Sequence, residues 1–275
     1  MASVIASDGV ELYAEAHGSG VPLLLSCGLC TTHENWRPQV APFVAAGLRV
    51  VLWDYRGHGR SAAPRDPAAY SMQQVVDDLG RVLAWGAGDQ PAIVGGLSFG
   101  GLASLHFALA QPQRVRALLL VDTGPGFKNP EAQARWMAQV ERTAGFLEAR
   151  GCQAFVESKA AATAIGLRPE LPAAQAAARA IAAQDPVGLA LFARRIAGVA
   201  PPVIDRLAEI ALPALVVVGE QDEPYLRAAD VLASRLPKAE AVRIPRAGHV
   251  VNLEEPQAFD AAVLGFLARI GVLAA

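Results

Sequence analysis

Short apolar runs alternate along the chain with segments of helical spacing. The run at 22–27 is almost continuously apolar, which is typical of a strand covered by helices on both faces. The first two expected strands should form a hairpin, because the turn residues at 7–9 separate them. The expected strands are Val4–Ala6, Glu11–Ala16, Pro22–Cys27, Leu48–Tyr55, Pro91–Leu97, Val115–Val121, Ala214–Gly219 and Ala241–Ile244.

The segments between these strands have the period of amphipathic helices. In Met72–Trp85 the apolar residues fall on one side, and Ser71 suits the N-cap position. The other expected helices are Phe99–Ala110, Leu226–Leu236 and Gln257–Ile270. Strands that alternate with helices predict an α/β fold, with a mostly parallel sheet and helices on both of its faces.

The alternation stops between about Pro125 and Pro202, where only helical spacing remains. Helix starts are expected at Asn129-Pro130 and Asp185-Pro186, since each pair suits an N-cap followed by proline at the first helical position. We predict that residues 125–205 form a helical cap inserted into a core made of 1–124 and 206–275. The cap should cover the carboxyl edge of the sheet, where ligands of open α/β sheets bind.

Composition narrows the class of protein. The chain has 275 residues, of which 53% are hydrophobic and 18% charged, so one α/β domain with an insertion can bury a large core. The formal net charge is −2 and no Lys/Arg block occurs, which disfavours binding to nucleic acid. No run of about 18 apolar residues and no signal-peptide pattern is present. We therefore expect a cytoplasmic protein that does not bind membranes.

The chain has three cysteines, and two of them form the C-x-x-C motif Cys27-Gly28-Leu29-Cys30. A structural zinc site needs about four ligands, and no second Cys pair or close His pair supplies them. A redox motif of the thioredoxin kind should open a helix, whereas the following residues 31–35 have the pattern of a loop. We interpret these cysteines as ordinary loop thiols.

The segment Gly96-Leu97-Ser98-Phe99-Gly100 is a G-x-S-x-G motif between an expected strand and an expected helix. This setting predicts a sharp turn that lifts Ser98 above the sheet in a strained conformation, with the two glycines leaving room for the backbone. The helix that follows directs its free N–H groups towards developing negative charge. Ser98 is the candidate nucleophile.

A serine hydroxyl needs a base to remove its proton. His249 follows the last strand and precedes the last helix, so it should emerge at the same sheet edge as Ser98. The other histidines fit structural roles better: we expect His106 to be held by packing in its helix and His58 to be a turn residue. His17 and His33 are expected at the surface or in loops. His249 is therefore the candidate base.

The acid that orients this histidine must also lie at a carboxyl edge. Asp222 follows the strand 214–219 and is the preferred candidate, because it can accept the Nδ1–H of His249. Asp122, after the strand 115–121, is the second candidate, and Glu220 is weaker. The oxyanion should be bound by two backbone N–H groups, those of Phe99 and of Leu29 in the loop after the strand 22–27.

At these residues the sequence resembles the α/β-hydrolase superfamily over nearly the whole chain apart from the cap. The segment from Asp54 to Ser61 is similar to the family's D-x-R-G-x-G-x-S turn, and Ala247-Gly248-His249 with Glu254-Glu255-Pro256 is similar to its histidine loop. The order Ser…Asp…His is that of the family. The resemblance implies the α/β-hydrolase fold and a Ser–His–Asp triad.

One departure concerns the oxyanion loop, where Cys27-Gly28 stands in place of the His-Gly of many members. The string Leu25–Thr32, together with Gly96-Leu97-Ser98, is similar to the 3-oxoadipate enol-lactonase branch, which also lacks that histidine. The resemblance thus implies hydrolysis of a carboxylic ester or lactone, a small molecule, through an acyl-enzyme and without a cofactor or metal.

Other functions stay open on the sequence. A carbon–carbon bond hydrolase or a cofactor-free perhydrolase would use the same three residues, and a non-catalytic ligand receptor can be built on this scaffold. Dehalogenase and epoxide-hydrolase chemistry is disfavoured, because those relatives have aspartate where Ser98 stands.

Overall fold

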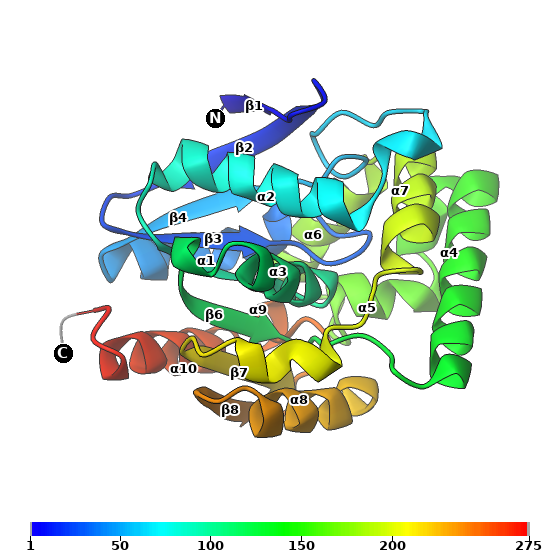
Figure 1. Cartoon of the computed structure of the whole chain (residues 1–275). Helices are drawn as coiled ribbons and strands as arrows, with labels where there is room; N and C mark the ends of the chain where they lie inside the picture. Colours follow the sequence, from blue (N-terminus) through cyan, green and yellow to red (C-terminus); the bar gives the residue numbers. More distant parts are fainter. Residues whose placement is uncertain (1, 274–275) are drawn as a thin grey trace.

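The computed structural model describes residues 2–273, which form one sheet with helices on both faces (Figure 1). The strand order is β1-β2-β4-β3-β5-β6-β7-β8. Strands β1 and β2 pair antiparallel, as does β2 with β4, and all other neighbours are parallel. The expected α/β-hydrolase fold is confirmed. The strands are β1 Ala2–Ile5, β2 Glu11–His17, β3 Val21–Ser26, β4 Leu48–Trp53, β5 Ala92–Leu97, β6 Val115–Val121, β7 Ala214–Gly219 and β8 Ala239–Ile244.

Helices cover the two faces of the sheet. Helices α2, α3 and α8 pack on one face, and α1 and α10 pack on the other. Successive residues of β3 alternate between the two faces, so Leu24 lies in one apolar cluster while Leu23 and Leu25 lie in the other. This explains why the strand is apolar at almost every position. The helices are α1 Arg37–Ala45, α2 Met72–Ala87, α3 Phe99–Ala110, α8 Glu223–Arg235, α9 Val251–Glu254 and α10 Pro256–Arg269.

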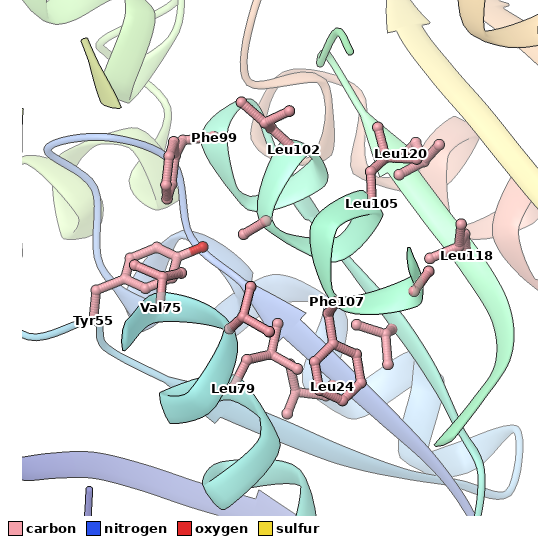
Figure 2. Close-up of a cluster of buried hydrophobic side chains, with 14 of the residues drawn as sticks. Leu24, Tyr55, Val75, Leu79, Phe99, Leu102, Leu105, Phe107, Leu118 and Leu120 are labelled. Carbon is pink, nitrogen blue, oxygen red and sulfur yellow. The ribbon is translucent and has the colours of Figure 1, made fainter. Parts of the chain in front are cut away.

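Figure 2 shows part of the cluster between α2, α3 and the sheet. The side chains are fully or almost fully buried, and each of them contributes about 1.5–3 kcal/mol of apolar burial. The cluster includes Leu24, Tyr55, Val75, Leu79, Phe99, Leu102, Leu105, Phe107, Leu118 and Leu120. Because Phe99 belongs to it, the core also anchors the first residue of α3.

A helical insertion runs between β6 and β7, and its helices gather at one end of the strands (Figure 1). The side chains of Asn129 and Asp185 cap α4 and α7 as expected, each accepting two backbone N–H groups. Gly151 interrupts α4 with a positive φ. The insertion contains α4 Pro130–Val156, α5 Ala162–Ile165, α6 Pro172–Ala182, α7 Pro186–Phe192 and a π-helical turn Ala193–Ala197.

Some elements differ from the expectation. Helix α1 was not expected, and the segment 31–35 is not a loop throughout, because a 3₁₀ turn begins at His33. There Thr32 and Asn35 form a reciprocal capping box. Strand β4 ends at Trp53, two residues early, and α8 begins at Glu223. Of the helices that the structure describes, none combines the length and apolarity needed to cross a membrane.

Candidate active site

Ser98 lies at the sharp turn between β5 and α3. Its φ and ψ are 54° and −115°, a conformation that costs a non-glycine residue about 1–3 kcal/mol. Hydrogen bonds hold the turn: Ser98 N donates to Val121 O at 2.8 Å, and Thr123 Oγ1 donates to Ser98 O at 2.5 Å. The strained turn expected for the G-x-S-x-G motif is therefore present.

The two glycines of the motif are required by the neighbouring strand. A Cβ on Gly96 would lie 2.6 Å from the carbonyl oxygen of Ser26, and a Cβ on Gly100 would lie 2.5 Å from the same oxygen. Ser26 is the last residue of β3, and the indole of Trp36 donates to its carbonyl at 3.1 Å. The turn and the end of β3 are thus packed too closely for side chains at these positions.

His249 and Asp222 meet at the same edge of the sheet. His249 Nδ1 lies 2.7 Å from Asp222 Oδ2, and the side chains are only 10% and 6% exposed. Asp222 follows β7, and His249 lies in the loop after β8. An imidazole held in this way donates its Nδ1–H to the carboxylate, which leaves Nε2 directed elsewhere as a proton acceptor.

Tyr225 packs against this pair and was missed by the sequence analysis. Its ring lies over the His249 imidazole, with 4.6 Å between the ring centroids and 36° between the planes. Burial raises the pKa of Tyr225, and the nearby Ser98 side chain offsets part of this rise. Among residues 2–273 no hydrogen bond joins Ser98 directly to His249; such bonds are often long in ligand-free sites and shorten with substrate.

Asp122, the second candidate acid, has a different position. It is fully buried and accepts backbone N–H groups from Gly219 at 2.8 Å and Val251 at 3.3 Å. Burial and the negative charge of Asp222 raise its pKa, and the two N–H donors offset part of this effect. Asp122 therefore ties the end of β7 to the segment after His249. Glu220 is exposed.

The loop after β3 lies directly beside Ser98. A Cβ on Gly28 would lie 3.5 Å from the Cβ of Ser98, which is ordinary van der Waals contact. Within residues 2–273 the backbone N–H groups of Leu29 and Phe99 donate to no other group. Two N–H groups without another acceptor are what the predicted oxyanion site requires.

The remaining histidines lie away from this pair. His58 is buried in the turn after β4, as expected, and burial lowers its pKa to about 4. His33 is not at the surface: it is 2% exposed, and its Nδ1 lies 2.7 Å from Asp54 Oδ2. His17 ends β2 and pairs with Glu15, whereas His106 in α3 contacts the carbonyl of Pro201.

The three cysteines are free and buried, and burial raises the pKa of Cys27, Cys30 and Cys152. A raised pKa disfavours the thiolate that redox exchange or metal binding requires. In the part of the chain that the structure describes, no group of three or more His, Cys, Asp or Glu side chains is arranged to hold a metal ion.

The helical insertion lies against the loop after β3. The side chain of Leu29 packs on a small apolar cluster from the insertion, formed by Val140, Ala144, Ala190 and Ala193. The ring of Phe192, at the end of α7, lies edge-on to Phe99, with 5.1 Å between the centroids. Both residues expected to bind the oxyanion therefore have side chains that contact the insertion.

Comparison with known proteins gives one family. Residues 21–256 match the family described as alpha/beta hydrolase fold. The chain is similar to a protein of Azorhizobium caulinodans provisionally named carbamate hydrolase RutD, with 31% identity over 94% of this chain and 96% of the relative.

Solved structures of hydrolases are similar to this chain over nearly its whole length. A thermophilic esterase from Thermogutta terrifontis is 26% identical, covers 98% of both chains and superposes with a TM-score of 0.83. The enol-lactonase from Burkholderia xenovorans is also 26% identical, with a TM-score of 0.80 over 97% of this chain and 99% of its own.

Proposed function

The chain belongs to the alpha/beta hydrolase fold family, and we propose that it is a serine hydrolase that cleaves a carboxylic ester or lactone through an acyl-enzyme. The observation that supports this most is the 2.7 Å contact between His249 Nδ1 and Asp222 Oδ2, beside a serine held at a strained turn. Strain of this kind is kept where function requires it.

The first step is attack by Ser98. Asp222 accepts the Nδ1–H of His249 and keeps the imidazole in the tautomer whose Nε2 can take the proton from Ser98 Oγ. Oγ then bonds to the carbonyl carbon of the substrate, and the carbonyl oxygen becomes negatively charged. The carboxylate of Asp222 stabilises the imidazolium that forms.

The negative oxygen is stabilised by the backbone N–H groups of Leu29 and Phe99. These donors are fixed before the reaction, so they need no reorganisation as the charge develops. The N-terminus of α3 adds the positive end of its dipole at the same place. When the intermediate collapses, His249 returns its proton to the leaving oxygen, and the acyl group stays on Ser98.

Water then releases the acyl group. His249 removes a proton from the water, the resulting hydroxide bonds to the acyl carbon, and the proton passes to Ser98 Oγ as the carboxylic acid leaves. In a lactone the leaving oxygen belongs to the same molecule, so a single hydroxy acid is released. Neither route uses a cofactor or a metal.

The helical insertion, residues 125–205, is in our proposal the cap that selects the substrate. Its apolar cluster packs on Leu29, which places the insertion next to the proposed oxyanion site. The names of the relatives, a carbamate hydrolase, an esterase and an enol-lactonase, all refer to compounds in which a carbonyl carbon is bonded to oxygen. This supports an ester or lactone as the substrate class, and a carbamate belongs in the test panel.

The proposal is tested with p-nitrophenyl esters, simple lactones and one carbamate. Ser98→Ala should lose at least about 10⁴-fold in kcat, whereas Ser234→Ala, at an exposed position on α8, should keep the wild-type rate. A fluorophosphonate should label only Ser98. Labelling of Ser26 or Ser61 instead, or a single slow turnover by the wild type, would refute the serine-hydrolase mechanism.

A further inference from the structure

The oxyanion loop contains a strained turn. Thr31 N donates to Gly28 O at 3.2 Å, which closes a four-residue turn around Leu29 and Cys30. Cys30 has a φ of 65° and Leu29 does not have a positive φ, so the turn is of type II. The third position of such a turn favours glycine. A cysteine there costs energy, and other contacts must hold the turn.

Two side chains hold the backbone of Cys30 from outside the loop. Cys30 N donates to His58 Nε2 at 3.2 Å, and Gln184 Nε2 donates to Cys30 O at 2.8 Å. Type I and type II turns differ by a flip of the central peptide. The N–H of Cys30 belongs to that peptide, so His58 opposes the flip while Gln184 fixes the next carbonyl.

Gln184 reaches this loop from the helical insertion. It lies between α6 and α7, it is 5% exposed, and its Oε1 accepts the N–H of Gly59 at 2.7 Å. The carboxamide therefore satisfies an acceptor and a donor of the core, and both hydrogen bonds are buried or nearly so. A buried donor or acceptor that loses its hydrogen-bond partner destabilises the folded state.

The same insertion also holds the side chain of Leu29. Leu29 packs against the cluster that Val140 and Ala144 of α4 form with Ala190 and Ala193. The turn is thus held on two sides. The Leu29 side chain packs in the apolar cluster, and the backbone of Cys30 is hydrogen-bonded to His58 and Gln184. Gly28, the first residue of the turn, lies beside Ser98.

We propose that Gln184 is a positioning residue, which holds the Gly28–Thr31 turn so that the Leu29 N–H faces Ser98. Because Gln184 belongs to the helical insertion, the oxyanion hole then depends on how the insertion packs against the core. The role of the Leu29 N–H rests on the proposed function, whereas the hold on the turn does not. Gln184 does not touch the reacting atoms; it acts through Cys30.

The test compares three variants. Gln184→Met has nearly the same volume but loses both hydrogen bonds, and Gln184→Glu keeps an acceptor for Gly59 N while losing the donor to Cys30 O. Gln175→Met is the matched control, because Gln175 is exposed on α6 and, among the described residues, its side chain reaches only Glu170 O, at 3.4 Å. Thermal unfolding of each variant shows the fraction that is folded.

The first measurement is hydrogen exchange of the backbone amides at 28–31, which needs no substrate. Both Gln184 variants should exchange at least about tenfold faster at Cys30 and Thr31 than the wild type, and Gln175→Met should not. The second is ester kinetics: kcat should fall by about 10²–10³-fold, as when one oxyanion donor is lost, with KM changed less than about threefold.

The outcomes separate the two proposals. Unchanged exchange in folded Gln184 variants overturns the hold on the turn, and faster exchange with an unchanged kcat overturns its role in positioning Leu29. Faster exchange together with a wild type that hydrolyses no ester, lactone or carbamate leaves the hold on the turn established and refutes the proposed function instead. A lower Tm with a normal kcat per folded molecule means that Gln184 is merely structural.

Discussion

Two buried aspartates stand at the ends of neighbouring strands, and their partners give them different roles. Asp222 contacts the imidazole of His249, whereas Asp122 accepts only backbone N–H groups among the described residues. Position after a strand did not distinguish them, since both lie at the carboxyl edge. The hydrogen-bond partner of each carboxylate distinguishes the two aspartates.

This difference predicts the effects of two substitutions. Asp222→Asn should lower kcat by about 10⁴-fold with the fold intact, because an amide leaves His249 in the wrong tautomer. Asp122→Asn should lower the free energy of unfolding, because its amide N–H₂ faces a backbone donor, and should reduce kcat less. The measurements are ester kinetics and urea unfolding of both variants. A larger kcat loss in Asp122→Asn would transfer the role of the acid to Asp122.

At the scale of the elements, the turn after β4 shows how this fold joins distant segments. Arg56 is fully buried there, and its Nε and Nη2 donate to the two carboxylate oxygens of Asp78 in α2 at 2.7 and 2.8 Å. Its Nη1 also donates to Asp8 at 2.7 Å and to Ala69 O at 2.6 Å. One guanidinium thus connects the first hairpin, the turn and α2.

We expect Arg56→Lys to lower the free energy of unfolding by about 3–5 kcal/mol, because a single ammonium group cannot serve these acceptors and leaves Asp78 buried without a bidentate partner. The control is Arg65→Lys, whose partner Asp185 is partly exposed, and this variant should unfold like the wild type. Urea unfolding measures both. Equal stability of the two variants would show that the buried network contributes little.

Helix starts were predicted correctly where the sequence has a clear N-cap residue. Ser71, Asn129 and Asp185 cap helices as their sequence positions predict. Helix α1 was missed because its sequence has almost no one-sided apolar pattern and contains Pro42. It is helical because Phe43 and its neighbours pack on the sheet and on α10, a contact between segments far apart along the chain.

At the scale of the whole molecule, stability should depend on pH through α10. Asp260 packs near Gln39 of α1, and burial raises the pKa of Asp260 to about 6. Since the unfolded chain has the ordinary value near 4, the native state binds more protons between these values, and stability is lost as pH rises from about 4 to about 6. Because Asp260 is partly exposed, the loss should be roughly 1 kcal/mol.

Asp260→Asn removes this charge and should raise Tm at pH 8 while leaving Tm near pH 4 unchanged. Thermal unfolding at both pH values measures the effect, and Asp89→Asn, at an exposed loop position, serves as the control. A stabilisation that is the same at pH 4 and pH 8 would mean that the ionisation of Asp260 is not its cause.

The sequence by itself determined the alternation of strands and helices, the helical insertion and the strained turn at Ser98. These depend on hydrophobic period, caps and glycines, which act over a few residues. It also placed Ser98, Asp222 and His249 at one edge, since each follows a parallel strand. The fold class and the family are confirmed by the structure and the comparisons.

Only the tertiary structure decided which side chains meet. It separated Asp222 from Asp122, brought Tyr225 over His249, and joined Gln184 to Cys30, residues 154 positions apart. No local pattern carries this information, because such contacts depend on how the layers pack. A buried acceptor must find a donor wherever packing places one, and here Gln184 of the helical insertion donates to Cys30 O in the loop beside Ser98.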